Sequence, residues 1–140
     1  MSREWVASVS RDRRFGGVRW DRRIEVPVVT LDDLIARHGP PAFCKIDVEG
    51  FETEVLRGLS RPLHALSFEY LPAAHDAAVS ALDQVERLGG TRGYEYNYSP
   101  VETMRFASSW LDRAGLQRLL EQRFRPLGRS GDVYARARLL

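Results

Sequence analysis

The sequence predicts an α/β domain whose sheet contains parallel strands, because a strand, a helix and a second strand follow one another early in the chain. Residues 43–48 form a short, nearly continuous apolar run of strand-forming residues, as expected for a strand that helices cover on both faces. Residues 51–59 have the apolar spacing of a short helix, and residues 63–69 form a second apolar strand. This order within about thirty residues is typical of a right-handed crossover unit with parallel strands.

Acidic residues end both predicted strands. Asp47 and Glu49 lie at the end of the first strand, and Glu69 ends the second. Parallel strands deliver their carboxyl ends to one edge of a sheet, and open α/β sheets bind their ligands at that edge. The three carboxylates are therefore predicted to share a site. Lys45, the only lysine of the chain, interrupts the first apolar run.

The composition is that of an ordinary soluble globular protein. The 140 residues fit one domain, 44% of them are hydrophobic and 29% are charged, and the net charge of +2 gives only a weak preference for acidic partners. Cys44 is the only cysteine and lies in an apolar run, so a disulfide framework is excluded and a reducing compartment is expected. No apolar run approaches membrane-spanning length, and the N-terminus lacks the apolar core of a signal peptide. No membrane partner is expected, and the expected localisation is cytoplasmic.

The rest of the chain divides into an N-terminal arm and several further elements. Residues 1–23 are rich in arginine without a regular period, which predicts an arm or loop ahead of a domain over residues 24–140. Residues 24–29 alternate as an edge strand, since Pro27 cannot donate to a sheet, and Thr30 opens a capping box that starts a short helix. The expected later elements are a helix over 74–88, a tyrosine-bearing strand over 94–98, a helix over 110–124 and a strand over 132–138.

Other chemistry receives less support from the sequence. Asp32 and Asp33 lie in the first turn of a helix, where the helix dipole favours carboxylates, so they are not expected to bind a metal. The three histidines lie on different predicted elements, and no metal site is expected. The three tyrosines of residues 94–98 would suit stacking on a base or a sugar, but cross-strand packing is the commoner use of such residues. The arginines do not interleave with the aromatic residues, so nucleic acid is not an expected partner.

Three sequence motifs resemble those of the FkbM-type methyltransferases. They are TLDDL at residues 30–34, KIDVEGFE at residues 45–52 and VLRG at residues 55–58. Members of that family are S-adenosylmethionine-dependent enzymes, mostly O-methyltransferases. The resemblance implies that the chain is the C-terminal half of a doubly wound, Rossmann-like class I methyltransferase sheet, mostly parallel with an antiparallel last strand. It also implies S-adenosylmethionine as the cofactor and a hydroxyl of a small molecule or a sugar as the acceptor.

One part of the family's pattern is missing from the sequence. In the family the cofactor lies on a glycine-rich turn after the first strand, and an acidic residue at the end of the second strand holds its ribose. The nearest glycine cluster here, at residues 89–93, follows a helix and precedes a strand, which is the reverse order. No intact cofactor-binding motif is therefore identified, and the strand over 43–48 is expected to lack a neighbour on one edge. Residues 24–29 would pair there, a second chain would complete the sheet, or the isolated chain would be marginally stable.

The resemblance makes the acidic cluster the candidate site for the methyl acceptor. Methyl transfer to an ordinary hydroxyl needs a base or a metal that receives or displaces its proton. Asp47 or Glu49 is the candidate for orienting or deprotonating the acceptor. Lys45 is expected to be an electrostatic neighbour of these residues, and Glu69 is expected to support them without contacting the acceptor. In the alternative interpretation, Lys45 pairs with one of the carboxylates and Glu49 caps the following helix.

Two functions follow from these observations. The first is a methyltransferase that is complete only with a partner chain, which includes a second copy in a homo-oligomer, or with an upstream segment. The second is a non-catalytic methyltransferase remnant that serves as an interaction module.

Overall fold

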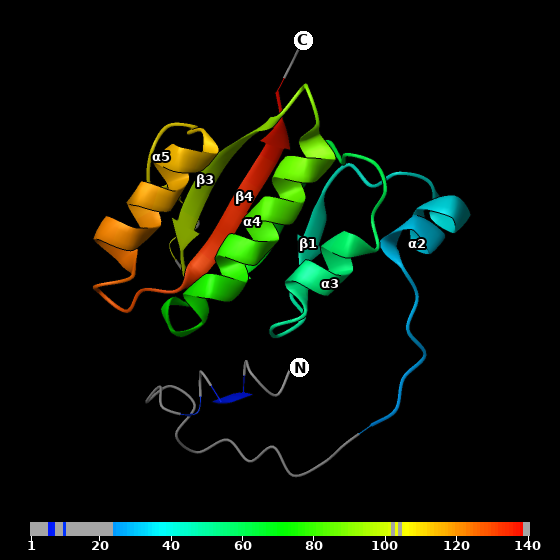
Figure 1. The fold of residues 1–140 in the computed structure, drawn as a ribbon, viewed down its shortest axis with the longest axis horizontal. Coiled ribbons are helices and arrows are strands. Elements are labelled where there is room, and N and C mark those ends of the chain that lie inside the picture. Colours follow the sequence, from blue (N-terminus) through cyan, green and yellow to red (C-terminus); the bar gives the residue numbers. More distant parts are fainter. Residues whose placement is uncertain (1–5, 8–9, 11–23, 102, 104, 139–140) are drawn as a thin grey trace.

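The computed structural model describes residues 6–7, 10, 24–101, 103 and 105–138. Almost all of the predicted arm over 1–23 lies outside these residues, so its prediction as a loop stays a prediction. The described part is an α/β structure in which helices pack on a four-stranded mixed sheet (Figure 1).

The sheet has the order β1-β2-β4-β3. Its strands are β1 (Cys44–Ile46), β2 (Ala65–Tyr70), β3 (Tyr94–Pro100) and β4 (Gly131–Ala137). The pair β1–β2 is parallel, which confirms the predicted crossover, and β4 is antiparallel to both of its neighbours. The last strand along the chain therefore runs against the other three, as the resemblance implied.

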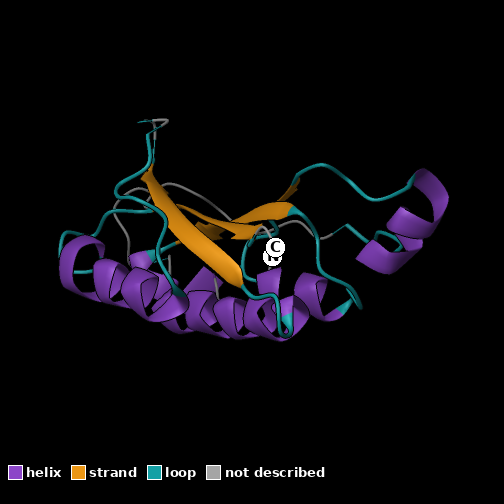
Figure 2. Cartoon of the chain, turned by 90° about the horizontal axis from the view of Figure 1, so that it is seen from above, coloured by secondary structure: helices purple, strands orange, loops and turns teal. Residues whose placement is uncertain are grey.

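The helices are α2 (Leu31–His38), α3 (Glu52–Arg57), α4 (His75–Gly89) and α5 (Arg113–Leu119), and α5 continues as a π-helical turn (Leu120–Phe124). Figure 2 shows the layer of helices beneath one face of the sheet, while loops border the other face. A doubly wound sheet carries helices on both faces, so that detail of the predicted fold is not confirmed by the described part of the chain.

The core lies between the sheet and this helix layer. Alternate residues of β2 and β4 point toward the helices, because side chains of a strand alternate between its two faces. Tyr94, Tyr96 and Tyr98 of β3 are at most 2% exposed, and the hydroxyl of Tyr94 donates to the carbonyl of Leu63 at 2.7 Å. Cross-strand and helix packing is therefore the use of these tyrosines, and their faces are closed to a stacking ligand.

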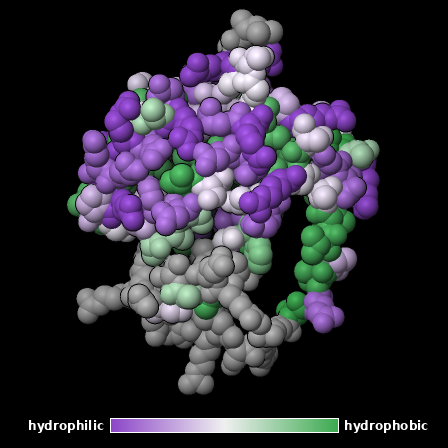
Figure 3. All heavy atoms as spheres, viewed as in Figure 1, coloured by the Kyte–Doolittle hydropathy of each residue, from purple (hydrophilic) through white to green (hydrophobic). Residues whose placement is uncertain are grey.

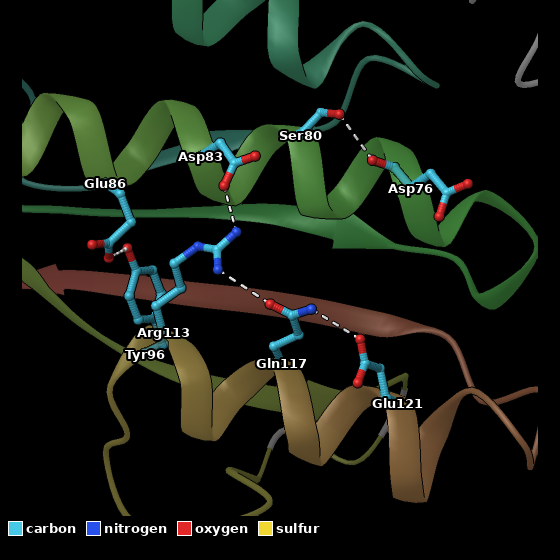
Figure 4. A network of polar contacts seen from close by, with 8 residues as sticks. All are labelled: Asp76, Ser80, Asp83, Glu86, Tyr96, Arg113, Gln117 and Glu121. Atoms are coloured by element: carbon cyan, nitrogen blue, oxygen red, sulfur yellow. Dashed lines mark hydrogen bonds and ion pairs between the residues drawn. The ribbon is translucent and has the colours of Figure 1, made fainter.

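A polar network on the far side of the core joins α4 to α5 (Figure 4). The guanidinium of Arg113 binds the carboxylate of Asp83 and also donates to Gln117 at 3.1 Å. Gln117 in turn donates to Glu121 at 2.9 Å, and the buried hydroxyl of Tyr96 donates to Glu86. These groups satisfy one another, which gives them a structural use away from the acidic edge of the sheet.

The capping box of α2 is confirmed. The Thr30 hydroxyl accepts from the backbone N–H of Asp33 at 3.1 Å, and the Asp33 carboxylate accepts from the N–H of Thr30 at 3.0 Å. Asp32 instead accepts from the N–H of Ser60 at 3.1 Å. The Asp33 carboxylate also accepts from the Thr30 hydroxyl at 2.7 Å. The hydrogen bonds from Thr30 hold the pKa of Asp33 below the ordinary value, and the one from Ser60 does the same for Asp32. The bond between Ser60 and Asp32 also fixes α2 against the chain that follows α3.

The predicted strand over 24–29 is wrong. No residue of this segment belongs to a helix or a strand, and Ile24, Val26 and Val28 are 86%, 68% and 90% exposed. In Figure 3 the segment forms a green, apolar column that stands apart from the body of the described chain. Alternation of apolar residues fixes only which faces a strand would present, and a strand also needs a neighbour for its backbone groups.

Two other boundaries also differ from the prediction. The strand predicted over 43–48 is only three residues long, and it lies at the edge of the sheet with Phe43 46% exposed, so helices do not cover both of its faces. The helix predicted from residue 110 begins at Arg113, because the Asp112 side chain caps it by accepting from the N–H of Gly115. The residue before that cap, Leu111, forms a bridge with Tyr96 of β3.

The core predicts a large cost for truncating an apolar side chain of α4. Leu82 is fully buried, and Leu82→Ala is expected to lower the free energy of unfolding by about 2–5 kcal/mol in urea denaturation. Leu127, which is 62% exposed, provides the matched control, and Leu127→Ala is expected to change that free energy by less than about 0.5 kcal/mol. Equal effects of the two substitutions would contradict this packing.

Candidate active site

The parallel pair β1–β2 brings the three predicted carboxylates together. Ile46 of β1 lies opposite Phe68 of β2, so the residues that follow them leave the same edge of the sheet. One oxygen each of Asp47, Glu49 and Glu69 lies within 4.8 Å of the others. We call these three residues the acidic cluster. The structure thus brings together the residues that the sequence placed at this edge, while their catalytic role stays a prediction.

The turn after β1 is held by a residue that the sequence interpretation missed. Glu52 is only 8% exposed, and one of its carboxylate oxygens accepts from the backbone N–H groups of Val48 at 3.3 Å and Gly50 at 3.2 Å. Gly50 has a φ of 91° and Glu49 a φ of 53°, which is uncommon for a residue with a side chain. The hydrogen bonds of Glu52 stabilise this left-handed turn, and the turn directs Glu49 toward the other carboxylates.

Glu49 does not cap the helix that follows it. The first residue before α3 is Phe51, and α3 has no side-chain cap. One carboxylate oxygen of Glu49 is instead buried without a hydrogen-bond partner. Burial, the nearby charge of Asp47 and that of Glu52 raise the pKa of Glu49, in this order of importance.

Lys45 provides the positive charge of the site, but its main partner is not in the acidic cluster. Its Nζ atom lies 2.8 Å from an oxygen of Asp132 on β4 and 3.5 Å from an oxygen of Asp47. The hydrogen bond to Asp132 raises the pKa of Lys45. Pairing of Lys45 with a carboxylate was an alternative interpretation of the sequence, and the structure confirms the pairing. The role of Asp132 could not be predicted from the sequence, because only the register of β4 against β2 places this residue opposite Glu69.

Glu69 has the most perturbed carboxyl group of the cluster. Desolvation is the main cause, and the charges of Glu49, Asp47, Glu52 and Asp132 add to it, so that the pKa of Glu69 rises from 4.5 to about 7. A cavity of about 10 Å³, which is room for one water molecule, lies between Glu69, Glu52 and the start of α4. At neutral pH this carboxyl group is therefore close to half protonated, and it is suited to both accepting and donating a proton.

Aromatic side chains lie on the face of the sheet that lacks helices (Figure 2), which is also the face of Lys45 and Glu69. Tyr134 lies opposite Ser67, on the same face as Lys45 and Glu69. Its ring is stacked against Phe43 with the centroids 6.1 Å apart and meets Phe106 edge-on at 5.2 Å. Carboxylates beside apolar rings resemble the polar and apolar mixture of a small-molecule site.

The described residues do not fit the expected cofactor by themselves. A turn that binds a nucleotide-like cofactor follows a strand, precedes a helix and uses glycines for close backbone approach. Gly90 and Gly93 lie between α4 and β3, so they follow a helix and precede a strand. A Cβ atom at either position would meet nothing within 4 Å, so neither glycine is needed to let another group approach the backbone closely. Gly50 does follow β1, but acidic residues surround it. Within the described ranges no glycine-rich turn has the required position.

The fold and the site together define a class of protein. An α/β domain with an acidic, partly desolvated edge at the carboxyl ends of two parallel strands is typical of an enzyme that binds a ligand at that edge. A comparison with known families narrows the class, since the model of the family described as "Methyltransferase FkbM domain" matches residues 3–96. This is more than half of the chain. The chain therefore belongs to the FkbM methyltransferase family, as its motifs predicted.

The family match extends from within the predicted arm to the first half of β3. No curated protein and no solved structure matches the chain. Among the described residues, every helix is too short or too polar to cross a membrane.

The raised pKa of Glu69 predicts how stability depends on pH. Below 4.5 the carboxyl group is protonated in both the folded and the unfolded chain, whereas above about 7 the folded chain must hold a buried charge. The contribution of Glu69 to stability is therefore fully present at low pH and is lost as the pH rises through about 7.

Glu69→Gln removes this titration, so it is expected to stabilise the protein relative to the wild type more at pH 8 than at pH 5. Urea denaturation at both pH values measures the difference. Glu54→Gln is the matched control, since Glu54 forms only an exposed pair with Arg57. A Glu69→Gln effect that does not change with pH, as expected for Glu54→Gln, would show that Glu69 has an ordinary pKa.

Proposed function

We propose that this protein is the acceptor side of an O-methyltransferase and that its acidic cluster receives the proton of a hydroxyl group on a small molecule or a sugar. The family supplies the methyltransferase class. The single observation that supports the acceptor role is the meeting of three carboxylates at the carboxyl edge of β1 and β2, one of them with a pKa of about 7. This is the pKa that a general base needs in order to work at neutral pH.

The raised pKa of Glu69 favours this residue as the proton acceptor. A hydroxyl that becomes an ether must lose its proton, and an ionised carboxylate with a raised pKa takes it up more readily than an ordinary carboxylate. The neighbouring charges of Asp47 and Glu49 help to raise the pKa of Glu69, so neutralising either one weakens the base. Asp47 is about half exposed and is suited to orienting the acceptor by a hydrogen bond.

Lys45 has a supporting role in this proposal. Asp132 holds its ammonium group at the border of the acidic cluster, where it offsets part of the negative charge. The aromatic rings of Phe43 and Tyr134 offer an apolar wall for the rest of the acceptor.

S-adenosylmethionine is the methyl donor expected from the family. Since the described residues do not form its binding turn, the proposal requires that other residues hold it, either elsewhere in this chain or in a partner chain. The same observation favours a second candidate, a non-catalytic methyltransferase remnant that acts as an interaction module. Calorimetric titration of the full chain with S-adenosylmethionine separates the two, because binding supports the enzyme and the absence of binding supports the remnant or a missing partner.

Substitutions in the acidic cluster test the assignment of the proton acceptor. Transfer of labelled methyl groups from S-adenosylmethionine to a panel of sugar and phenol hydroxyls is the assay, with any required partner chain present. Glu69→Gln is expected to lower the rate by about 10²–10⁴-fold, the usual effect of losing a general base, and Asp47→Asn to lower it less.

Glu54→Gln again provides the control, since this residue lies on the outer surface of α3, and its rate is expected to equal that of the wild type. Full activity of both Glu69→Gln and Asp47→Asn would overturn the assignment of the site.

A further inference from the structure

Strand β1 has an open edge. It pairs with β2 along one side, and no strand of the described chain lies along the other side. The backbone groups of Cys44–Ile46 on that side are therefore available to another strand. Strand β1 is also partly apolar, because Ile46 is buried and Cys44 is half-buried on the face toward the helices.

In the part of the chain that the structure describes, the extended segment 24–29 lacks a neighbouring strand, just as the outer edge of β1 does. Figure 1 shows it leaving α2 as an open trace that runs away from the sheet. Among the described residues it makes no backbone hydrogen bond, and its apolar side chains at positions 24, 26 and 28 are mostly exposed. An apolar run of this kind without a partner is unusual on a soluble domain and indicates a surface that another chain covers.

The alternation of this segment fits the open edge of β1. In an extended strand, residues 24, 26 and 28 share one face, and residues 25, 27 and 29 share the other. If the even-numbered residues lie beside Cys44 and Ile46, their apolar side chains extend the helix-covered core. In a strand that runs parallel to β1, their backbone N–H and C=O groups are then the ones that turn toward β1, and Pro27, which has no N–H to donate, turns outward. Pro27 thus suits an outermost strand.

Charge complementarity supports the same orientation. With the even-numbered residues beside Cys44, Glu25 lies on the other face of the sheet, which is the face of Lys45. Lys45 already has acidic neighbours, but its side chain is 49% exposed and its ammonium group has three N–H donors, so it can donate a hydrogen bond to a further carboxylate. The opposite orientation would place Glu25 against the apolar side of β1.

We propose that residues 24–29 of one copy of this chain add to the edge of β1 in a second copy, so that two copies complete each other's sheets. Within one chain the segment ends at α2, and the first turn of α2 is fixed to the chain after α3 by two hydrogen bonds of Asp32, to Gly58 and Ser60. This attachment leaves the segment exposed in its own chain. Addition to β1 of a second copy gives hydrogen-bond partners to the backbone groups of both the segment and β1, and it keeps the hydrogen bonds of Asp32 that attach α2.

Cysteine cross-linking tests this proposal, because Cys44 is the only cysteine and lies on β1. Val26→Cys and Val28→Cys place a second thiol on the face that the proposal puts beside Cys44. After mild oxidation of the full chain, at least one of them is expected to give a disulfide-linked dimer on a non-reducing gel. The dimer is expected to disappear when Cys44→Ser is added.

Matched controls place the thiol on the opposite face. Glu25→Cys and Val29→Cys are expected to give no more dimer than the wild type. A disulfide within one chain would show that the segment pairs with its own β1, and equal cross-linking from both faces would show that contact is not ordered. Either result would overturn the proposal.

The mass of the protein in solution gives an independent readout. Light scattering is expected to show a monomer–dimer equilibrium, and Val28→Asp is expected to weaken the dimer by about tenfold or more, because it places a charge among apolar side chains. Far-UV circular dichroism confirms that the variant is folded. A wild type that stays monomeric at all concentrations would contradict strand addition between copies.

Discussion

Parallel pairing between β1 and β2 is the constraint on which the acidic cluster depends. The crossover through α3 sets both strands in one direction, and their register places Asp47 and Glu69 at a common edge. The carboxylate of Glu52 then fixes the turn that adds Glu49. Acidic groups that lie this close together and are partly buried repel one another, which costs stability and raises the pKa of Glu49 and Glu69. Such a cost is common at functional sites, where strained or repulsive arrangements are part of the mechanism.

Local chemistry made much of this arrangement predictable from the sequence. The apolar runs around Ile46 and Phe68, with a short helix between them, are sufficient to predict a parallel pair, and the direction of that pair places the acidic residues. Likewise, the sequence from Thr30 to Asp33 contains both partners of the capping box within four residues. Both features depend on residues that are close together along the chain, so a single sequence is sufficient to predict them.

The features that the sequence did not predict depend on contacts between distant segments. Asp132 lies 87 residues from Lys45 along the chain, and only the register of β4 against β2 brings them together. Residues 24–29 have the alternation of a strand, yet they remain outside the sheet, because the hydrogen bonds of Asp32 to Gly58 and Ser60 attach the start of α2 to the chain after α3. The same reasoning explains why membership of a methyltransferase family does not by itself locate the cofactor. The family pattern places it on a turn that the described residues do not contain.

The protonation of Glu69 provides the sharpest test of this site, because it depends on burial and on all the surrounding carboxylates at once. Carbon-13 NMR of the labelled side-chain carboxyl groups, followed through a pH titration, measures it directly. The expected midpoint for Glu69 is about 7, and it should fall toward the ordinary value in Glu49→Gln and Asp47→Asn. A midpoint near 4.5 in the wild type, unchanged in both variants, would show that the three carboxylates do not form a coupled site.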